Sequence, residues 1–479
     1  MNNKGRKTKI IATLGPASAT SESIAKLMDA GADLFRLNFS HGANADKGRI
    51  IDIVRALSSR RGKEIAILAD LQGPKIRTGR MENGAIPLRK GENLSISTEE
   101  LIGRPGMIST IYKALPNDVR QGSRILMDDG LIELKVNSVE AGIVNCTVVE
   151  GGILKDLKGI NLPGVNVSSP SLTEKDRIDL EFCLEKGVDY LALSFVRKSE
   201  DVKELKSIIA AHGLTIPVIA KIEKPEALRN FKSILAVADA IMVARGDLGV
   251  EINAEKVPLI QKKIINECNE AGKPVITATQ MLESMILHPR PTRAETSDVA
   301  NAILDGTDAV MLSGETASGS FPVEAVRTMV KVALDVERSG LWRMTNRQPP
   351  ASSHAVPVAV AEAACHAAAT VKAKAVVVFT QSGSTAARIA RFRPQLPIIA
   401  FTPSDEIRRR LALYWGVRAL PVGIMENSDQ QIKLVEETLL DTGFKRGDVV
   451  VITLGVPLGS SGSTNLMKVH KLGQIYPLK

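Results

Sequence analysis

An alternation of strand-like and helix-like segments, repeated along most of the chain, constrains the fold more than any other feature of the sequence. Apolar runs long enough for buried strands are separated by segments of helical periodicity, which is typical of a parallel sheet covered by helices. The strands predicted in this way are residues 8–14, 34–39, 65–69, 190–195, 218–222, 240–244, 275–279 and 309–313. The helices expected between them include 21–30, 45–59, 174–186, 258–271, 293–304 and 323–336. Eight strand–helix units are the number that closes a (β/α)8 barrel of the TIM type.

Two further regions depart from this alternation. Residues 72–169 contain short β-like runs with turn signals such as Asn83-Gly84, which indicates a compact all-β insertion. The insertion follows the third predicted strand at the end of the barrel where active sites lie, so we expect it to act as a lid. After a linker that contains Pro349 and Pro350, a shorter α/β pattern begins. The predicted domains are a barrel formed by 1–71 and 170–345, an all-β lid at 72–169, and a C-terminal α/β domain at 346–479.

The composition argues against several classes of protein. The four cysteines are widely scattered and lack the paired spacing of a metal site, so we expect reduced thiols. No stretch approaches the roughly 18 apolar residues that a membrane helix needs. Gly15-Pro16 also interrupts the apolar run near the N-terminus, so no secretory signal is expected there. These features predict a cytoplasmic protein with no membrane partner.

The net charge of +9 raises the question of nucleic-acid binding. The lysines and arginines are dispersed among acidic residues, and aromatic residues make up only 3% of the chain, which leaves few surfaces for base stacking. We predict that the one dense cluster, Arg408, Arg409 and Arg410, is a solvated helix face. No nucleic-acid partner is therefore expected, and the excess of cations suits an enzyme that handles phosphorylated anions.

Charged residues follow two neighbouring predicted strands. Lys221 and Glu223 end one strand and share a face of it, because they are two residues apart. Asp247 follows the next strand. Such charges are costly to bury unless they bind something charged, and Mg²⁺ takes one or two carboxylates together with substrate oxygens. The sequence thus indicates a divalent-cation site for an anionic substrate; a structural salt bridge among the three residues is the alternative.

Polar residues also follow most of the other predicted barrel strands. They are Arg36, Asn38, Ser40 and His41 at the end of the second strand, Asp70 at the end of the third, Thr279 at the end of the seventh, and Ser313 and Glu315 at the end of the eighth. This set of carboxylates, cations and hydroxyls suits phosphoryl transfer, which depends on positioning and charge stabilisation more than on covalent chemistry.

Six motifs resemble those of the pyruvate kinase family. They are RLNFSHG at 36–42, DLQGPKIR at 70–77, KGINLPG at 158–164, KIE at 221–223, MVARGDLGVEI at 242–252 and ATQMLESM at 278–285. The resemblance covers essentially the whole chain in order, including the lid and the C-terminal domain. It implies a glycolytic phosphotransferase that uses Mg²⁺ or Mn²⁺ to transfer the phosphoryl group of phosphoenolpyruvate to ADP, giving ATP and pyruvate. It also implies a homotetramer that a phosphorylated metabolite activates.

Carried onto the matching residues, the resemblance implies a catalytic role for each. Glu223 and Asp247 would hold the Mg²⁺ ion, and Arg36 would grip the transferring phosphoryl group. Lys221 would stabilise the charge that develops in the transition state. Gly246 and Asp247 would offer backbone N–H groups to the substrate carboxylate. Thr279 would contact the substrate, and the family links this residue to protonation of enolpyruvate.

The same resemblance implies a nucleotide site between the barrel and the lid. Its residues are Arg77, Lys158, His41 and Asn38. Because Lys158 comes from the lid, lid closure would complete this site and exclude water.

One departure from the family pattern concerns K⁺. Members that bind K⁺ use residues matching Asn38, Ser40, Asp70 and the position after Asp70, which is usually Thr. Here that position is Leu71, and the motif that usually carries Glu reads GPKIR, with Lys75 in its place. We hypothesise that the Lys75 ammonium replaces the monovalent cation, so that K⁺ would not be required. In the alternative, Lys75 points into solvent and K⁺ binds through the remaining oxygens.

A glycine and four hydroxyl residues lie between a predicted strand and a predicted helix of the C-terminal domain. They are Thr380, Ser382, Gly383, Ser384 and Thr385. Such a loop at a helix N-terminus can bind phosphate, and ordinary helix capping is the alternative. The resemblance favours an effector-phosphate site, over which the loop GVPLGSSGST at 455–464 would close. That loop has no cation and no aromatic residue, which favours a monophosphate effector over a bisphosphate.

Two other functions fit parts of the sequence. A Mg²⁺-dependent enolate lyase or aldolase of pyruvate would use the same Lys, Glu and Asp set on a barrel, but it would not depend on ADP. A sugar-phosphate sensor built on the C-terminal domain would leave the charged end of the barrel unexplained.

Overall fold

The computed structural model describes residues 5–341, 355–423, 427–456 and 464–474. Eight parallel strands form a closed barrel. They are β1 Lys9–Leu14, β2 Leu34–Asn38, β3 Ala66–Asp70, β12 Tyr190–Leu193, β13 Val218–Ile222, β14 Ala240–Ala244, β15 Val275–Ala278 and β16 Ala309–Leu312. Around the barrel the order is β1–β16–β15–β14–β13–β12–β3–β2, so the predicted (β/α)8 fold is confirmed.

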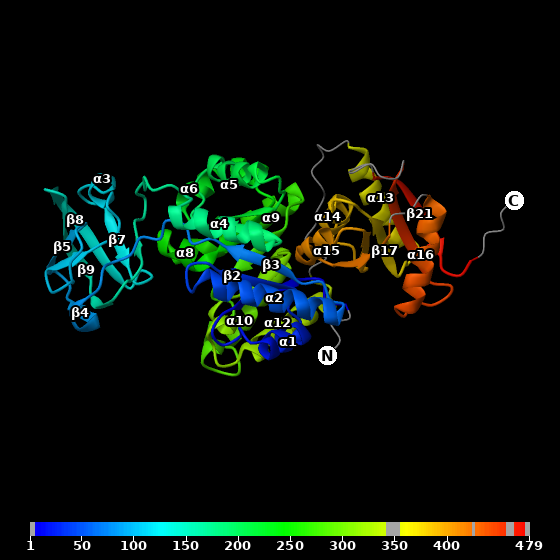
Figure 1. The fold of residues 1–479 in the computed structure, drawn as a ribbon, viewed down its shortest axis with the longest axis horizontal. Coiled ribbons are helices and arrows are strands. Elements are labelled where there is room, and N and C mark those ends of the chain that lie inside the picture. The colour runs from blue at the N-terminus through cyan, green and yellow to red at the C-terminus, as the bar shows by residue number, and fades with distance from the viewer. Residues whose placement is uncertain (1–4, 342–354, 424–426, 457–463, 475–479) are drawn as a thin grey trace.

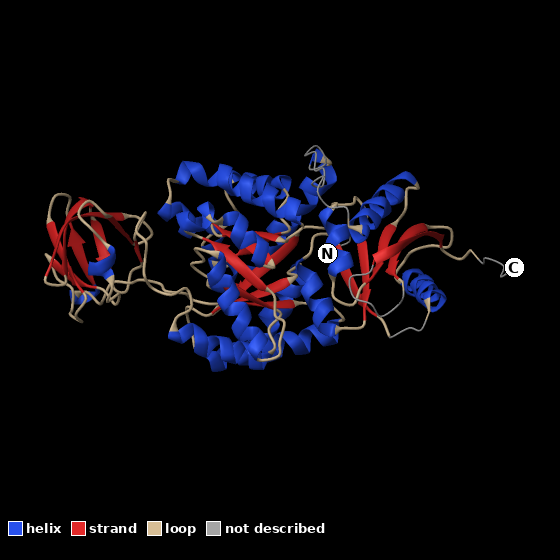
Figure 2. Cartoon of the chain, turned by 90° about the horizontal axis from the view of Figure 1, so that it is seen from above, coloured by secondary structure: helices blue, strands red, loops and turns tan. Residues whose placement is uncertain are grey.

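Helices surround the barrel strands (Figure 2). They include α1 Ser21–Ala30, α2 Asn44–Arg61, α4 Glu174–Lys186, α5 Ser199–Ala211, α7 Phe231–Val237, α9 Val257–Ala271, α10 Arg293–Asp305 and α12 Pro322–Ser339. Local sequence sets their ends: Thr173 begins α4 with a capping box, and Gly62 ends α2 in the left-handed conformation at φ 56°. Three further helices come directly after the barrel strands β13, β14 and β16. They are α6 Pro225–Arg229, α8 Arg245–Glu251 and α11 Gly314–Ala317.

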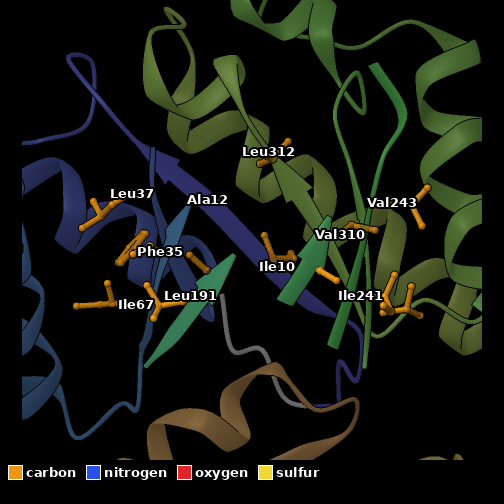
Figure 3. Packing of buried hydrophobic residues seen from close by; sticks show 14 of the residues in the cluster. Ile10, Ala12, Phe35, Leu37, Ile67, Leu191, Ile241, Val243, Val310 and Leu312 are labelled. Atoms are coloured by element: carbon orange, nitrogen blue, oxygen red, sulfur yellow. The ribbon is translucent and has the colours of Figure 1, made fainter. Parts of the chain in front are cut away.

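Alternate residues of each barrel strand face opposite sides. Ile10 and Ala12 pack outward among the helices, whereas Ile11 belongs to the cluster that fills the barrel interior. Figure 3 shows the outward set from several strands, including Phe35 and Val310. Because both faces are buried, the strands are mostly apolar until the end where charges gather.

The lid is an all-β unit inserted between β3 and α4 (Figure 1). Its six-stranded sheet has the order β11–β7–β8–β9–β5–β6, and β10 pairs with β4. The elements are η1 Glu82–Gly84, β4 Ala85–Leu88, β5 Asn93–Ser97, β6 Met107–Ser109, α3 Leu115–Asp118, β7 Arg124–Met127, β8 Ile132–Glu140, β9 Ile143–Glu150, β10 Gly152–Lys155 and β11 Ile160–Asn161. The lid has an apolar core of its own and lies beyond the end of the barrel at which the strands finish, which we term the C-terminal mouth (Figure 1).

The C-terminal domain contains a five-stranded sheet in the order β19–β18–β17–β20–β21. Its elements are α13 Val356–Thr370, β17 Ala375–Phe379, α14 Ser384–Arg391, β18 Ile398–Thr402, α15 Asp405–Arg410, η5 Leu411–Leu413, β19 Val417–Pro421, α16 Ser428–Asp441, β20 Val449–Gly455 and β21 Thr464–Lys471. The sequence did not predict β21, which pairs antiparallel with β20. The linker predicted at 346–353 lies outside the described residues.

The C-terminal domain closes the barrel end where the strands begin, which we term the N-terminal mouth. Ala412 and Leu413 of η5 belong to the same apolar cluster as the barrel interior, and Leu413 is fully buried. The hydroxyl of Tyr190 on β12 donates to the carbonyl oxygen of Arg410 at 2.6 Å. The interior of the barrel is thus sealed at one end by a neighbouring domain.

The prediction of a solvated helix face at Arg408, Arg409 and Arg410 is wrong. Arg408 Nε donates to Glu64 at 2.9 Å, and Arg409 Nε donates to Asp189 at 2.7 Å. Both carboxylates belong to the barrel, so the arginines attach the C-terminal domain to it. Guanidinium groups suit this task because their planar donors match carboxylates even when partly buried.

Candidate active site

Lys221 of β13 lies at the centre of the charged cluster at the C-terminal mouth. Its Nζ is 2.7 Å from Glu223 Oε1 and 3.3 Å from Asp70 Oδ1, and it donates to Ser194 Oγ at 2.7 Å. Burial disfavours the ammonium, but the carboxylates of Asp70, Glu223 and Asp247 together raise the pKa of Lys221 above its ordinary value. Lys221 is therefore a fixed positive charge among these carboxylates.

Asp70 connects Lys221 with Arg36 of β2. Arg36 Nε and Nη2 each lie 2.7 Å from Asp70 Oδ2, and Arg36 Nη1 donates to Thr13 Oγ1 at 3.1 Å. Burial alone would raise the pKa of Asp70, but Lys221 and Arg36 hold it below its ordinary value. Asp70 thus fixes the side chains of Arg36 and Lys221 next to each other at the C-terminal mouth.

Glu223 and Asp247 supply carboxylate oxygens beside these cations. Glu223 is 1% exposed, and its Oε2 accepts from the backbone N–H of Phe195 at 2.8 Å. Burial raises the pKa of Glu223, and the charge of Asp247 adds to the effect against the opposing influence of Lys221. The side chain of Asp247, in the first turn of α8, makes no hydrogen bond or ion pair with any residue that the structure describes. Two close carboxylates, one of them unpaired, fit a hard divalent cation.

Within the described ranges, no group of three or more His, Cys, Asp and Glu residues could hold a metal ion. A metal at Glu223 and Asp247 would therefore complete its coordination with substrate oxygens and water, as Mg²⁺ usually does.

Thr279 and Gly246 lie next to each other. The backbone N–H of Gly246 donates to Thr279 Oγ1 at 2.7 Å, and the Thr279 hydroxyl donates to the carbonyl oxygen of Ala278 at 2.6 Å. The N–H that the sequence assigned to the substrate carboxylate is thus paired with the Thr279 hydroxyl here.

The predicted nucleotide residues lie on both sides of the passage from barrel to lid. Arg77 Nη1 donates to the carbonyl oxygen of Leu157 at 2.9 Å, and Lys158 Nζ is 2.7 Å from Asp128 Oδ1 within the lid. Burial lowers the pKa of His41, and the charges of Arg77, Lys75, Lys47 and Arg36 lower it further.

The predicted K⁺ residues are already engaged with one another and with the cations. Asn38 Oδ1 accepts from the backbone N–H of Ser40 at 3.0 Å, and both oxygens of Asp70 face Arg36 or Lys221. The Leu71 side chain is 1% exposed and packs in the apolar cluster between the barrel strands and the helices, so it offers no ligand. The Lys75 ammonium has no ion pair in the part of the chain that the structure describes.

The loop predicted to bind an effector phosphate begins α14. Gly383 adopts φ 82° and lies against Ile407 and Leu411, where a Cβ would come within 3.5 and 3.4 Å of their side chains. The hydroxyls are not equivalent: Ser382 donates to Ser384 at 3.2 Å, whereas Thr385 pairs with Thr464 at 2.6 Å and is buried. Thr380 is also buried, and its backbone N–H donates to Phe401. Most of the loop at 455–464, namely 457–463, lies outside the described residues.

Sequence reasoning missed three residues that organise these sites. Ser194 follows the fourth barrel strand and pairs with Lys221; its position at a strand end could have revealed it. Arg245 bridges α8 and the end of β15. Arg388 Nη1 donates to Ser384 Oγ at 3.2 Å, and the spacing of four residues along a helix could have indicated this contact. Glu315, which was among the polar residues predicted at strand ends, has a structural role instead. Its carboxylate accepts hydrogen bonds from the backbone N–H groups of Ser313 and Leu282 and so stabilises the loops.

Comparisons with known proteins agree with this geometry. The family model described as "Pyruvate kinase, barrel domain" matches residues 5–326, and "Pyruvate kinase, alpha/beta domain" matches residues 358–470. The chain is 50% identical over 475 residues to the pyruvate kinase of Geobacillus stearothermophilus, covering 98% of this chain and 81% of that protein. It is 48% identical to the pyruvate kinase of Mycobacterium intracellulare, covering 98% and 99%. The crystal structure of a pyruvate kinase from Cryptosporidium parvum superposes with a TM-score of 0.91 at 38% identity, covering 98% of this chain and 97% of the other.

The closed barrel, the inserted lid and the charged C-terminal mouth define a (β/α)8-barrel enzyme of the phosphotransferase class. The chain belongs to the pyruvate kinase family. Membership implies a divalent-metal requirement and the substrates phosphoenolpyruvate and ADP. The comparisons give no support to the enolate lyase or aldolase alternative.

Proposed function

We propose that this chain transfers the phosphoryl group of phosphoenolpyruvate to ADP, giving ATP and pyruvate. The observation that carries the proposal is the placement of the Lys221 ammonium between Asp70, Glu223 and Ser194, with Arg36 on the far side of Asp70. Phosphoryl transfer has little covalent chemistry for a protein to perform, so fixed charge is the main catalytic requirement.

Each catalytic residue has a role that follows from its contacts. Arg36 binds the transferring phosphoryl group. Its guanidinium is suited to this because Asp70 contacts one edge of the group and fixes the orientation of the guanidinium plane. Lys221 stabilises the negative charge that grows as the phosphoryl group leaves and the enolate forms. The backbone N–H groups of Gly246 and Asp247 bind the substrate carboxylate. Thr279 contacts the same carboxylate and lies on the path of the proton that converts enolpyruvate to pyruvate.

Glu223 and Asp247 would hold Mg²⁺ or Mn²⁺ at this site. When bound, the metal supplies positive charge to the phosphoryl and carboxylate oxygens of the substrate. The two carboxylates fit this purpose because they lie close enough for Asp247 to raise the pKa of Glu223.

The lid completes the nucleotide site in this proposal. Arg77, His41 and Asn38 would line the barrel side, and Lys158 would leave Asp128 to meet the nucleotide phosphates when the lid closes. Closure also excludes water, which would otherwise compete with ADP for the phosphoryl group.

We further propose that activity does not require K⁺. Asp70 is neutralised by Arg36 and Lys221, Leu71 provides no oxygen, and the Lys75 charge contributes to the positive potential at the neighbouring His41. A monovalent cation at Asn38, Ser40 and Asp70 would enter a region that already carries several cationic side chains.

Regulation by a phosphorylated metabolite is also part of the proposal. Ser382, Ser384, Gly383 and the nearby Arg388 would bind its phosphate at the start of α14, with Thr380 and Thr385 shaping the loop from beneath. Replacing Ser384 with Glu should abolish activation and leave basal turnover intact, because a carboxylate repels the phosphate. Unchanged activation in initial-rate assays of S384E would remove this loop from regulation.

The assembly, location and domain limits complete the proposal. We expect a homotetramer in the cytoplasm, with domain limits at 1–71 and 170–345 for the barrel, 72–169 for the lid and 346–479 for the C-terminal domain. In the described ranges, no helix is both long and apolar enough to cross a membrane.

Pyruvate release from phosphoenolpyruvate tests the function directly. The assay is run with Mg²⁺, with and without ADP, and in a tetramethylammonium buffer with and without KCl. Turnover that needs Mg²⁺ and ADP and ignores KCl is the expected result. Strong activation by KCl would retain the function and discard the role of Lys75, and no ADP-dependent turnover would contradict the function itself.

A further inference from the structure

The backbone at the end of β15 adopts an unusual conformation. Thr279 has φ 68° and Gln280 has φ 52°, so two successive non-glycine residues lie in the left-handed region. This is especially unfavourable for a β-branched threonine. Strain of this kind persists only where the surroundings impose it, and it is common at functional sites. Something must therefore hold Thr279 in place.

The guanidinium of Arg245 contacts the carbonyl oxygens of all three residues at this turn. Its Nη2 donates to Thr279 O at 2.7 Å and to Gln280 O at 3.2 Å. Its Nε lies 3.3 Å from both Ala278 O and Thr279 O. One rigid planar group therefore fixes the direction of three successive peptide units.

The same guanidinium is anchored from its other side. Arg245 Nη1 forms an ion pair with Asp298 of α10 at 2.7 Å and donates to Gln261 of α9 at 3.3 Å. The Arg245 side chain is only 10% exposed. Contacts with α9 and α10 thus fix the Arg245 guanidinium in place. The guanidinium therefore cannot move together with the turn at residues 278–280 if the backbone of that turn relaxes.

Arg245 is also the first residue of α8, the helix that carries Gly246 and Asp247. The Gly246 N–H donates to the Thr279 hydroxyl, so the backbone and the side chain of this segment act on Thr279 from two directions. This hydrogen bond connects Gly246, whose N–H is proposed to bind the substrate carboxylate, with Thr279, which is proposed to lie on the path of the proton.

We propose that Arg245 is a positioning residue that imposes the left-handed conformation of Thr279 and Gln280 and thereby aims the Thr279 hydroxyl at the substrate. This inference rests on the proposed function and adds to it a residue that touches neither substrate nor metal. Lysine cannot replace it, because a single ammonium on a flexible stem cannot span three carbonyls while paired with Asp298.

The test combines Arg245→Lys with substitutions at Gln280. Arg245→Lys should lower kcat by about 10²-fold, because small displacements of an aligned group are costly, while KM for phosphoenolpyruvate changes much less. Adding Gln280→Gly should restore kcat by about fivefold, since glycine adopts positive φ without strain. Adding Gln280→Ala should restore nothing. Gln280→Gly alone should leave kcat within about twofold of the wild type, because Arg245 already holds the turn in its left-handed conformation.

Arg6→Lys is the matched control for loss of a buried guanidinium. Arg6 also bridges backbone carbonyls and an aspartate, with Nη2 at 2.7 Å from Gly31 O and 2.8 Å from Asp33, but it lies at the N-terminal mouth. Its substitution should lower the melting temperature without the loss of kcat. If Arg245→Lys does not fold, Asp298→Asn weakens the same anchor and should show a smaller loss with the same rescue.

The results of these assays distinguish the role of Arg245 from the proposed function. Rescue by glycine and not by alanine supports the role of Arg245. Equal behaviour of the two, or a kcat loss in Arg245→Lys no larger than in Arg6→Lys, overturns it while the function stands. An absence of ADP-dependent turnover in the wild type would instead refute the proposed function.

Discussion

The two mouths of the barrel are built from the same strands and are put to opposite uses. At the N-terminal mouth, Leu413 and Ala412 of the C-terminal domain seal the interior with apolar side chains. At the C-terminal mouth, the interior ends in Lys221, Glu223 and Asp70, which are charged and nevertheless almost fully buried. One end gains stability by excluding water, and the other retains charge that a substrate and a metal can use.

The treatment of aspartates shows the difference most clearly. Asp189, at the N-terminal mouth, accepts from Arg55 at 2.8 Å, from Arg409 at 2.7 Å and from the backbone of Ile67 at 2.7 Å. Asp247, at the C-terminal mouth, has no such partner among the described residues. A buried carboxylate whose partners all belong to the protein, such as Asp189, stabilises the fold. An unpaired carboxylate beside Glu223, such as Asp247, can instead bind a cation.

The largest predicted effect is the loss of activity in Asp247→Asn. The substitution removes one of two proposed metal ligands, and kcat should fall by about 10³-fold, in line with the several kcal/mol that a metal contributes. The free energy of unfolding should change by no more than about 1 kcal/mol, because no hydrogen bond or ion pair is lost. Steady-state kinetics and urea unfolding measure the two quantities. A fall in stability comparable to the fall in activity would contradict the contrast between the mouths.

The reverse behaviour is predicted for Leu413→Ala. Removing a fully buried leucine from the apolar seal should lower the free energy of unfolding by about 2–5 kcal/mol. Basal kcat should stay within about twofold of the wild type at temperatures where the protein remains folded, since no catalytic group moves. Leu259→Ala, at an exposed position of α9, is a control for leucine truncation and should be nearly neutral.

A smaller effect is expected for Arg409→Ala. Asp189 would keep Arg55 and the Ile67 N–H, so the loss should be about 1.5–3 kcal/mol, as for one hydrogen bond to a charged group. The effect should shrink at high salt, because Arg409 is partly exposed at 22%. Thermal unfolding at low and high NaCl measures it, and a loss equal to that of Leu413→Ala would show that ion pairs, and not the apolar seal, close this mouth.

The barrel could be predicted because its strands are continuous apolar runs, and its charged end because the charges begin where those runs stop. The attachment of the C-terminal domain could not. Arg408 and Arg409 have the spacing of an exposed helix face, and their partners Glu64 and Asp189 lie far away in the chain. Nothing local distinguishes an arginine paired across domains from one in water. Similarly, β21 was missed because its residues are mostly half-buried or exposed and its apolar pattern is weak.

At the candidate site, residue types at strand ends were sufficient to nominate Lys221, Glu223 and Asp247, but not their partners. Ser194 is a common residue whose importance comes from its 2.7 Å contact with Lys221. The role of Arg245 depends on backbone conformation at Thr279, which no spacing in the sequence encodes. Such geometric dependences require the fold itself.

The most direct test of the division between the mouths is ADP-dependent pyruvate release measured side by side for Asp247→Asn and Leu413→Ala, at equal concentrations of folded protein. We expect Asp247→Asn to be nearly inactive and Leu413→Ala to turn over at close to the wild-type rate. Full activity in Asp247→Asn, or inactivity in folded Leu413→Ala, would contradict the assignment of catalysis to the C-terminal mouth and of stability to the N-terminal one.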